Sequence, residues 1–543
     1  MKLTVTSLLL ALLHSRSAFS AAVTAPAKVT KQVTLDIVNV EAAPDGFQRS
    51  IISANGKYPG TLITANKGDT LVVTVNNKLT DATMRRSTSM DFDGIFFTTQ
   101  NAFMEGTPFV TACPIAPNAS FVYTLPLGEQ AGTFWYHSQL SVQYVDGLRG
   151  PLIIYDPEDP HRNLYDVDNE DTIWQVGDWW HNSTIPLLDG YVATGIVPVS
   201  DSGTFNGAGR FNGGPEVPFF VQNVQAGKRY RFRIINQSAR NVFTMSVDNH
   251  DLTVIAADGV ETVAHTVNEI QMFAGQRYDV VLHANQPVGN YWINAPFVGG
   301  DPTRNLNQNG TLSRAILRYA GARAVDPAGP MTDGPANPNL LLESDLRPLV
   351  PEVVPPADMN ITLELVVTTG KAQWNVNGVS YLPPTTPTLV KILDGQTDQA
   401  AFNQTENTFL LPANQTVQII FPPSEDDEAH HKKIDQDVHR RATAFHLHGN
   451  NFWLIKSNFS DVINEVNPIR RDVAPVGSAG TIVRFRTDNP GPWFFHCHIF
   501  WHMQAGLATV MVQDVDGIAA GDRPNQAWET LCPAYDALPA ELQ

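Results

Sequence analysis

The segment Trp493-Phe494-Phe495-His496-Cys497-His498-Ile499-Phe500-Trp501-His502 holds the densest group of metal-ligand residue types in the chain. Its aromatic beginning predicts a β-strand. Successive side chains of a strand point to opposite faces, so we expect His496 and His498 to point one way and Cys497 the other. Two metal sites would then meet across one strand. The plainer alternative is a set of buried histidines around an inert cysteine.

Each side of this strand has a possible metal chemistry. Copper-thiolate sites use a cysteine and imidazoles, with a weak or absent axial ligand. Cys497 and His502 suit such a site, and Leu507 stands five residues further on. On the other side, His446-Leu447-His448 repeats the alternation and would add two imidazoles to a shared metal cluster. Taken alone, that pair also fits an ordinary surface His-x-His.

The remaining sequence predicts an all-β fold. Short β-rich runs bounded by turn residues have the spacing of β-sandwiches. They include Thr70 to Val75, Ser120 to Leu125, Arg229 to Ile234, Tyr278 to Leu282, Thr416 to Phe421 and Thr481 to Arg486. Four of these runs follow a glycine-containing turn, and this rough repeat favours three related sandwiches. The turns are Asn66 to Thr70, Gln225 to Arg229, Ala274 to Tyr278 and Gly477 to Thr481.

Length and turn-rich stretches predict the domain organisation. A chain of 543 residues has room for roughly three or four domains. Tyr155 to Arg162 and Arg323 to Pro338 are rich in turn residues and predict boundaries. The predicted units are a signal peptide at 1–20 and domains at 21–158, 159–325 and 326–543. The charge-dense stretch Ser424 to Arg441 predicts a solvated surface insertion.

Charge and the N-terminus predict the compartment and exclude some partners. A formal net charge of −18 disfavours nucleic acids and anionic membranes, so we expect neither as a partner. The apolar run Leu3 to Leu13, with small residues before Ala21, matches a secretory signal. Eight glycosylation sequons agree with a secreted, extracellular glycoprotein. They begin at Asn118, Asn182, Asn236, Asn309, Asn360, Asn403, Asn414 and Asn458.

Four segments together resemble the copper-binding signatures of fungal laccases, which are multicopper oxidases. They are the Cys497 segment, the His446 segment, Gly132 to Gln139 and Asp146 to Gly150. The resemblance covers essentially the whole mature chain. It implies three cupredoxin-type Greek-key β-sandwich domains, a blue type 1 copper in the third, and a three-copper cluster between the first and third. In that family, phenols give single electrons to the type 1 copper, and four electrons reduce dioxygen to water.

The resemblance also assigns copper ligands to this sequence. Cys497 and His502 match type 1 ligands, and Leu507 matches the axial neighbour that does not coordinate. His446 matches a type 2 ligand. The type 3 pair is matched by His137, His448, His496 and His498. Electron transfer from an aromatic substrate would enter at His502, next to Cys497.

Four positions depart from the family pattern. Asp91 and Asp93 stand where the family has one type 2 and one type 3 histidine, Gln139 replaces another type 3 histidine, and Thr443 replaces a type 1 histidine. Aspartate binds copper but is a harder ligand than imidazole, whereas glutamine and threonine are weak ligands. We expect fewer coppers than the family's four. The alternative for the type 1 site is that His430, His431 or His439 of the insertion serves as a substitute ligand.

Further matches concern protons, substrate and cysteines. Glu105 matches an acidic position that feeds protons to the oxygen cluster, although a surface carboxylate near a turn is an equal alternative. Arg240 stands where the family has an acidic, phenol-binding residue, which favours anionic substrates. Cys113 and Cys532 match a family disulfide, and the partners of a second disulfide are replaced by Val145 and Ala239.

Two functions fit this combination of matches and losses. The first is a secreted laccase-like oxidase of phenolic or related aromatic substrates, coupled to O2 reduction, with a partial copper set. The second is a catalytically silent paralogue that binds or stabilises an active laccase, for example as a heterodimer. The retained Cys497 and its flanking histidines favour the first, and the four replaced ligands favour the second.

Overall fold

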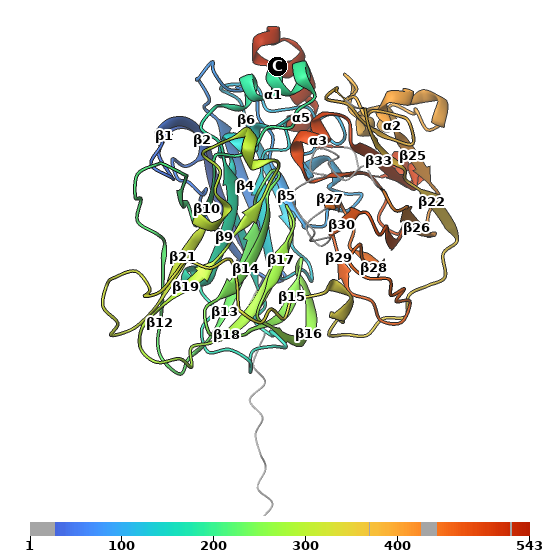
Figure 1. Cartoon of the computed structure of the whole chain (residues 1–543). Coiled ribbons are helices and arrows are strands. Elements are labelled where there is room, and N and C mark those ends of the chain that lie inside the picture. The colour runs from blue at the N-terminus through green and yellow to red at the C-terminus, as the bar shows by residue number, and fades with distance from the viewer. Residues whose placement is uncertain (1–27, 369, 425–441, 522–523) are drawn as a thin grey trace, which may run out of the picture.

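The computed structural model describes residues 28–368, 370–424, 442–521 and 524–543. The predicted signal peptide and the three histidines of the insertion lie outside the described residues. The described chain is built mostly from β-strands, which sort into three consecutive sequence segments, each with its own sheets. Figure 1 shows the first segment in blue, the second in green and the third in orange and red. The predicted all-β fold is therefore confirmed.

The first segment forms two four-stranded sheets, ordered β2-β1-β4-β6 and β3-β8-β7-β5. Its strands are β1 (Thr30–Ala42), β2 (Arg49–Ala54), β3 (Ile63–Asn66), β4 (Thr70–Asn77), β5 (Asp91–Asp93), β6 (Ser120–Pro126), β7 (Gly132–His137) and β8 (Arg149–Tyr155). Buried and partly exposed residues alternate along β4, as in a strand with one face in the core. All six residues of β7 are buried, because both of its faces are covered.

The second segment forms a seven-stranded sheet, β11-β10-β9-β13-β18-β15-β16, and a six-stranded sheet that contains β12-β21-β19-β14-β17 with β20 beside β14. Its strands are β9 (Ile173–Trp179), β10 (Ser202–Phe205), β11 (Ala208–Arg210), β12 (Val221–Val224), β13 (Arg229–Asn236), β14 (Val242–Val247), β15 (Leu252–Ala257), β16 (Val260–Val267), β17 (Ile270–Met272), β18 (Arg277–His283), β19 (Asn290–Asn294), β20 (Phe297–Val298) and β21 (Arg314–Tyr319).

The third segment forms two five-stranded sheets, β22-β26-β31-β28-β29 and β25-β33-β32-β27-β30, and a hairpin, β23-β24. Its strands are β22 (Met359–Thr362), β23 (Leu365–Val367), β24 (Trp374–Val376), β25 (Thr408–Leu411), β26 (Thr416–Phe421), β27 (Ala442–Leu447), β28 (Phe452–Lys456), β29 (Arg470–Arg471), β30 (Val473–Gly477), β31 (Thr481–Arg486), β32 (Gly491–Cys497) and β33 (Ala508–Gln513). The predicted strand before Cys497 is thus β32, and all seven of its residues are buried.

The helices are short and lie outside the sheets. They are α1 (Thr184–Thr194), α2 (Thr388–Leu393), α3 (Phe500–Gln504), α4 (Val515–Ala520), α5 (Gln526–Glu529) and α6 (Leu531–Asp536). The expected disulfide is present: Cys532 of α6 is bonded to Cys113, which ties the C-terminal tail to the first segment. Within the described residues, no helix combines the length and apolar character needed to cross a bilayer.

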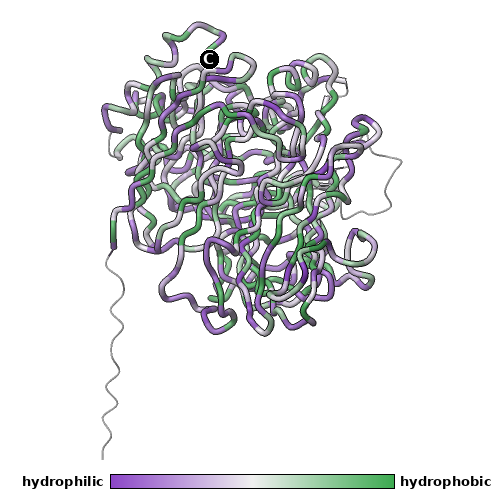
Figure 2. The backbone as a smooth tube through the Cα atoms, turned by 90° about the vertical axis from the view of Figure 1, so that its left-hand side faces the viewer, coloured by the Kyte–Doolittle hydropathy of each residue, from purple (hydrophilic) through white to green (hydrophobic). Residues whose placement is uncertain are grey.

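The glycine turns that sequence spacing picked out are confirmed. Gly68, Gly227, Gly275 and Gly480 all have left-handed φ values, between 76° and 88°. A side chain is strained in that conformation, so glycine is the natural residue where each turn enters its strand. Figure 2 shows hydrophilic residues gathered in the outer turns and hydrophobic ones along the interior strands.

Candidate metal centre

Two pairs of neighbouring strands bring the predicted ligands together. In the first segment, β5 pairs with β7, so that Asp91 lies opposite His137. In the third, β27 pairs with β32, so that His446 lies opposite His496. The two strand pairs lie against each other where the first and third segments meet (Figure 1). The contact between Asp93 of β5 and His498, just beyond β32, joins them.

One half of the resulting cluster contains Asp93, His137 and His498. The two carboxylate oxygens of Asp93 lie 3.0 Å from His137 Nε2 and 3.0 Å from His498 Nε2. His446 Nε2 lies 3.9 Å from the same carboxylate. All of these side chains are buried.

The other half contains His448, His496 and Gln139. The Nε2 atoms of His448 and His496 are 3.0 Å apart, and the amide nitrogen of Gln139 lies 3.2 Å from His496 Nε2. Asp91 approaches His448 Nε2 at 3.8 Å through Oδ2, which has no hydrogen-bond partner in the described part of the chain.

Four of the imidazoles are anchored in the same way. The Nδ1–H groups of His137, His446 and His496 donate to the main-chain carbonyls of Ser138, Asp472 and Cys497, at 2.9 to 3.0 Å. The fourth, His448, donates from Nδ1 to the Glu105 carboxylate. Imidazoles that bind metals are typically held at one nitrogen in this manner, which turns the other toward the ion.

This anchoring leaves acceptor atoms facing each other. A carbonyl only accepts hydrogen bonds, so a neutral His137 donates from Nδ1 and turns a bare Nε2 toward the Asp93 carboxylate. The same holds for His448 and His496, whose Nε2 atoms face each other. A cation resolves both contacts, since two ligands about 2.1 Å from a metal and about 90° apart are about 3.0 Å from one another. The cluster therefore fits metal ions.

Burial and neighbouring charges shape the acidity of these groups. Burial raises the pKa of Asp93, but positive charge on the His137 and His446 imidazoles, when they are protonated, outweighs it and holds that pKa well below its usual range. Burial and the Glu105 and Asp93 carboxylates raise the pKa of Asp91 well above its usual range. Burial, reinforced by His448, holds the pKa of His496 well below the usual range of histidine.

The cysteine side of β32 is arranged differently. Cys497 Sγ lies 3.8 Å from His502 Nδ1 and 2.6 Å from the hydroxyl of Thr443. Thr443 thus occupies the position of the imidazole that the resemblance led us to expect. Leu507 is buried, and the His502 ring, which is 1% exposed, packs against Trp374 with a centroid distance of 4.4 Å.

Among the described residues, this second arrangement does not complete a blue copper site. Such a site needs two imidazoles and a thiolate, and Thr443 supplies only a hydroxyl. The Thr443 hydroxyl is in direct contact with Cys497 Sγ, at 2.6 Å.

Two other predicted residues are buried away from solvent. Glu105 is held by Thr107 and Thr111, whose hydroxyls donate to it at 2.8 and 2.9 Å, so the surface alternative is wrong. The guanidinium of Arg240 donates to the carbonyl of Val197 at 3.0 Å, and the side chain is 5% exposed. Its proposed contact with substrate stays a prediction.

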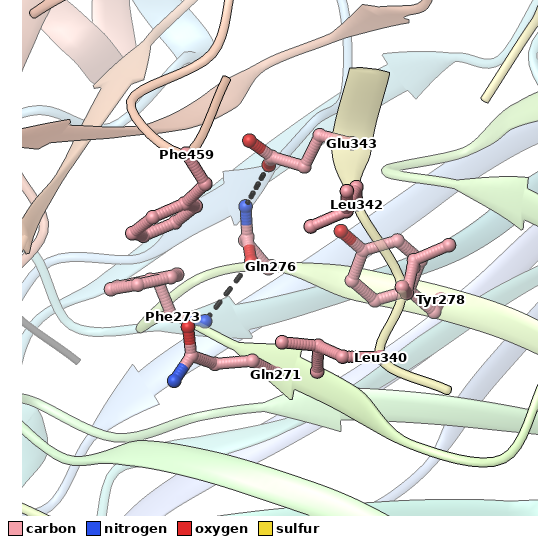
Figure 3. A pocket seen from close by; sticks show the side chains of 9 residues that line it. Gln271, Phe273, Gln276, Tyr278, Leu340, Leu342, Glu343 and Phe459 are labelled. Atoms are coloured by element: carbon pink, nitrogen blue, oxygen red, sulfur yellow. Dashed lines mark hydrogen bonds between the residues drawn. The ribbon is translucent and has the colours of Figure 1, made fainter. Parts of the chain in front are cut away.

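The second segment supports the metal centre through an ion pair that the sequence did not predict. Arg277 makes a bidentate ion pair with Asp472, with both distances 2.7 Å, and the Asp472 carbonyl anchors His446. These residues are 195 positions apart, and no local motif signals their contact. Figure 3 shows the adjacent junction, where Gln276 bonds Glu343 at 3.0 Å beside Phe459. The cavity there is only about 10 Å³, too small for a substrate.

Comparisons with known proteins agree with this architecture. Three family models described as multicopper oxidase match residues 36–159, 170–322 and 381–517. The chain is 44% identical to Laccase-2 of Agaricus bisporus over 522 residues, which covers 95% of this chain and 96% of that protein. It is 56% identical to the laccase-like protein claX of Ampulloclitocybe clavipes over 425 residues, 73% of this chain and 97% of that one.

A comparison with solved structures also supports this family. The crystal structure of the laccase from Botrytis aclada superposes with a TM-score of 0.81 at 31% identity, covering 94% of this chain and 93% of that one. Matching family models, sequence relatives and fold thus agree over nearly the whole length. The chain belongs to the multicopper oxidase family, among its fungal laccases.

Proposed function

We propose that the chain is a secreted, glycosylated laccase-like oxidase that carries electrons from phenolic or related aromatic compounds to O2 with fewer than four coppers. The observation that carries this proposal is the set of four imidazoles tied at Nδ1 and turned inward at Nε2. Such anchoring is typical of imidazoles that bind a metal. Three domains with boundaries near residues 158 and 325 are part of the proposal.

Each residue of the cluster has a proposed role. His137, His498 and Asp93 would hold one ion, and His448 and His496 a second, with Gln139 as a weak third ligand. His446 and Asp91 would flank a third. Bound copper would supply the redox step toward dioxygen. Glu105 acts through His448: its carboxylate accepts a hydrogen bond from Nδ1–H and so fixes the imidazole with its Nε2 lone pair toward the centre.

A second candidate is a silent subunit that binds an active laccase. It is favoured by the Thr443 hydroxyl against Cys497, which leaves His502 as the one imidazole near the thiol among the described residues. Without a thiolate-bound copper, electrons from a phenol lack the entry site that the family uses.

Copper content and oxygen uptake distinguish the two candidates. Purified protein is loaded with copper, and the copper per chain and the oxygen consumed with a simple phenol are measured. Bound copper with phenol-dependent oxygen uptake supports the oxidase. An absence of both, together with co-purification of a complete laccase, supports the silent subunit.

A further inference from the structure

The half-cluster around Asp93 combines three strong ligands from three places in the chain. Asp93 ends β5, His137 ends β7 and His498 follows β32. Their side chains are at most 1% exposed, and one ligand atom from each lies within 4.8 Å of the other two. The group is thus a carboxylate with two imidazoles, enclosed by protein.

We propose that Asp93, His137 and His498 form a self-contained site for one divalent first-row metal ion, which it binds without copper elsewhere in the chain. The inference rests on the proposed function for the location of the cluster, but it does not depend on oxidase turnover. It gives this chain a mononuclear centre where the resemblance implies one member of a copper pair.

The contact between His137 and Asp93 carries the first step. The Ser138 carbonyl accepts a hydrogen bond from Nδ1–H of His137, so in the neutral imidazole Nε2 turns a lone pair toward the carboxylate oxygen 3.0 Å away. Two acceptors at that distance repel each other unless a proton or a metal ion lies between them or beside them. A metal ion bound by both atoms satisfies them at the distance observed.

The second step concerns which ion the site prefers. Carboxylate is a harder ligand than imidazole, and a set of two histidines and one carboxylate is typical of divalent ions such as Fe²⁺. The negative charge of Asp93 also stabilises the higher charge of a divalent ion over Cu⁺. Replacement of a histidine by Asp93 therefore shifts the site away from an ion that must cycle through the monovalent state.

The third step separates this site from its neighbour. The other half offers His448 and His496, with the Gln139 amide as a weak third ligand. Metal affinity depends on the number of strong ligands, so the Asp93 half should fill first. The two halves can be tested independently, since each has ligands that the other lacks.

The test is a Co²⁺ titration of the metal-free protein, followed by visible absorption and by metal analysis after gel filtration. Wild type should bind a single Co²⁺. Asp93→Asn, which keeps the shape but removes the charge, should weaken binding by more than about tenfold, and so should His137→Gln. Two matched controls should keep the site: His448→Gln, in the other half, and Cys497→Ser, on the thiol side.

Several results would overturn the proposal. They are no Co²⁺ uptake by wild type, uptake unchanged in both Asp93→Asn and His137→Gln, or uptake lost in Cys497→Ser, which would assign the ion to the thiol. Circular dichroism of each metal-free variant checks its fold, and if Asp93→Asn does not fold, His137→Gln makes the comparison. Co²⁺ binding without any phenol oxidation would uphold this inference while the proposed function fails. Copper-dependent turnover without Co²⁺ binding would uphold the proposed function while this inference fails.

Discussion

The two faces of β32 carry different sets of metal-binding groups in this protein. On one face, His496 and the neighbouring His498 lie in a cluster of imidazoles and carboxylates. Its facing nitrogen and oxygen atoms are suited to bind cations. On the other face, Cys497 contacts the Thr443 hydroxyl, and the described residues bring one imidazole, that of His502, to the thiol. On the cluster face, Asp91 and Asp93 can still bind a metal and Gln139 can bind one weakly. On the thiol face, Thr443 offers only a hydroxyl. Slower electron entry at the thiol face can therefore coexist with retained metal binding at the cluster face.

The largest effect should come from restoring both faces together. In a variant with Asp91→His, Asp93→His, Gln139→His and Thr443→His, we expect phenol-dependent oxygen uptake to rise roughly a thousandfold, equivalent to about 4 kcal/mol of barrier. Oxygen-electrode assays measure it. The matched control keeps Thr443 and carries only the other three changes; its uptake should stay low because electrons still lack an entry site. High oxygen uptake in that control would show that Thr443 does not limit electron entry, and would contradict the contrast drawn between the two faces.

Restoring the thiol face alone should change colour more than activity. Thr443→His adds the second imidazole, so the intense blue thiolate-to-copper absorption should appear after copper loading, in contrast to a weak or absent band in wild type. Thr443→Ser, which keeps a hydroxyl, should stay colourless. A strong band in wild type would mean that another side chain completes the site.

An effect of intermediate size is expected at Glu105. Glu105→Gln weakens the acceptor that anchors His448 Nδ1, and the loss of such a supporting contact typically lowers metal affinity about 10- to 100-fold. Copper competition with a chelator measures this. Glu129→Gln, at a carboxylate that is 86% exposed, is the matched control and should change nothing. Equal affinities in both variants would remove Glu105 from the metal centre.

The smallest effect should follow removal of the thiol. Cys497→Ser should leave the copper content of the wild-type protein unchanged, because the described residues bring only one imidazole, His502, and the Thr443 hydroxyl to the thiol. Metal analysis of the two proteins, loaded side by side, measures it. A loss of one copper per chain in the variant would show that the thiol face is occupied.

Much of this architecture could be predicted from local sequence. Alternation along His496 to His498 gave the two faces, and glycine turns such as Gly68 marked where strands begin. The resemblance identified Thr443 as the replaced ligand, and the structure brings it to Cys497. The alternation and the turns depend on spacing within a few residues, which the sequence displays directly, whereas Thr443 was identified by its motif.

The anchoring of the cluster could not be predicted in the same way. Main-chain carbonyls such as that of Ser138 hold the imidazoles, and a carbonyl has no sequence signature. The Arg277 and Asp472 pair joins different sheets over a long sequence separation. Glu105 was recognised by its motif, yet its bond to His448 depends on how the first and third segments pack.

The central claim is that the cluster face binds metal while the thiol face does not. The most direct measurement is copper per chain in loaded wild-type protein, taken together with its visible spectrum. The account predicts bound copper in less than the full set of four, with at most a weak blue band. Four coppers with a full-strength blue band, or no copper at all, would contradict it.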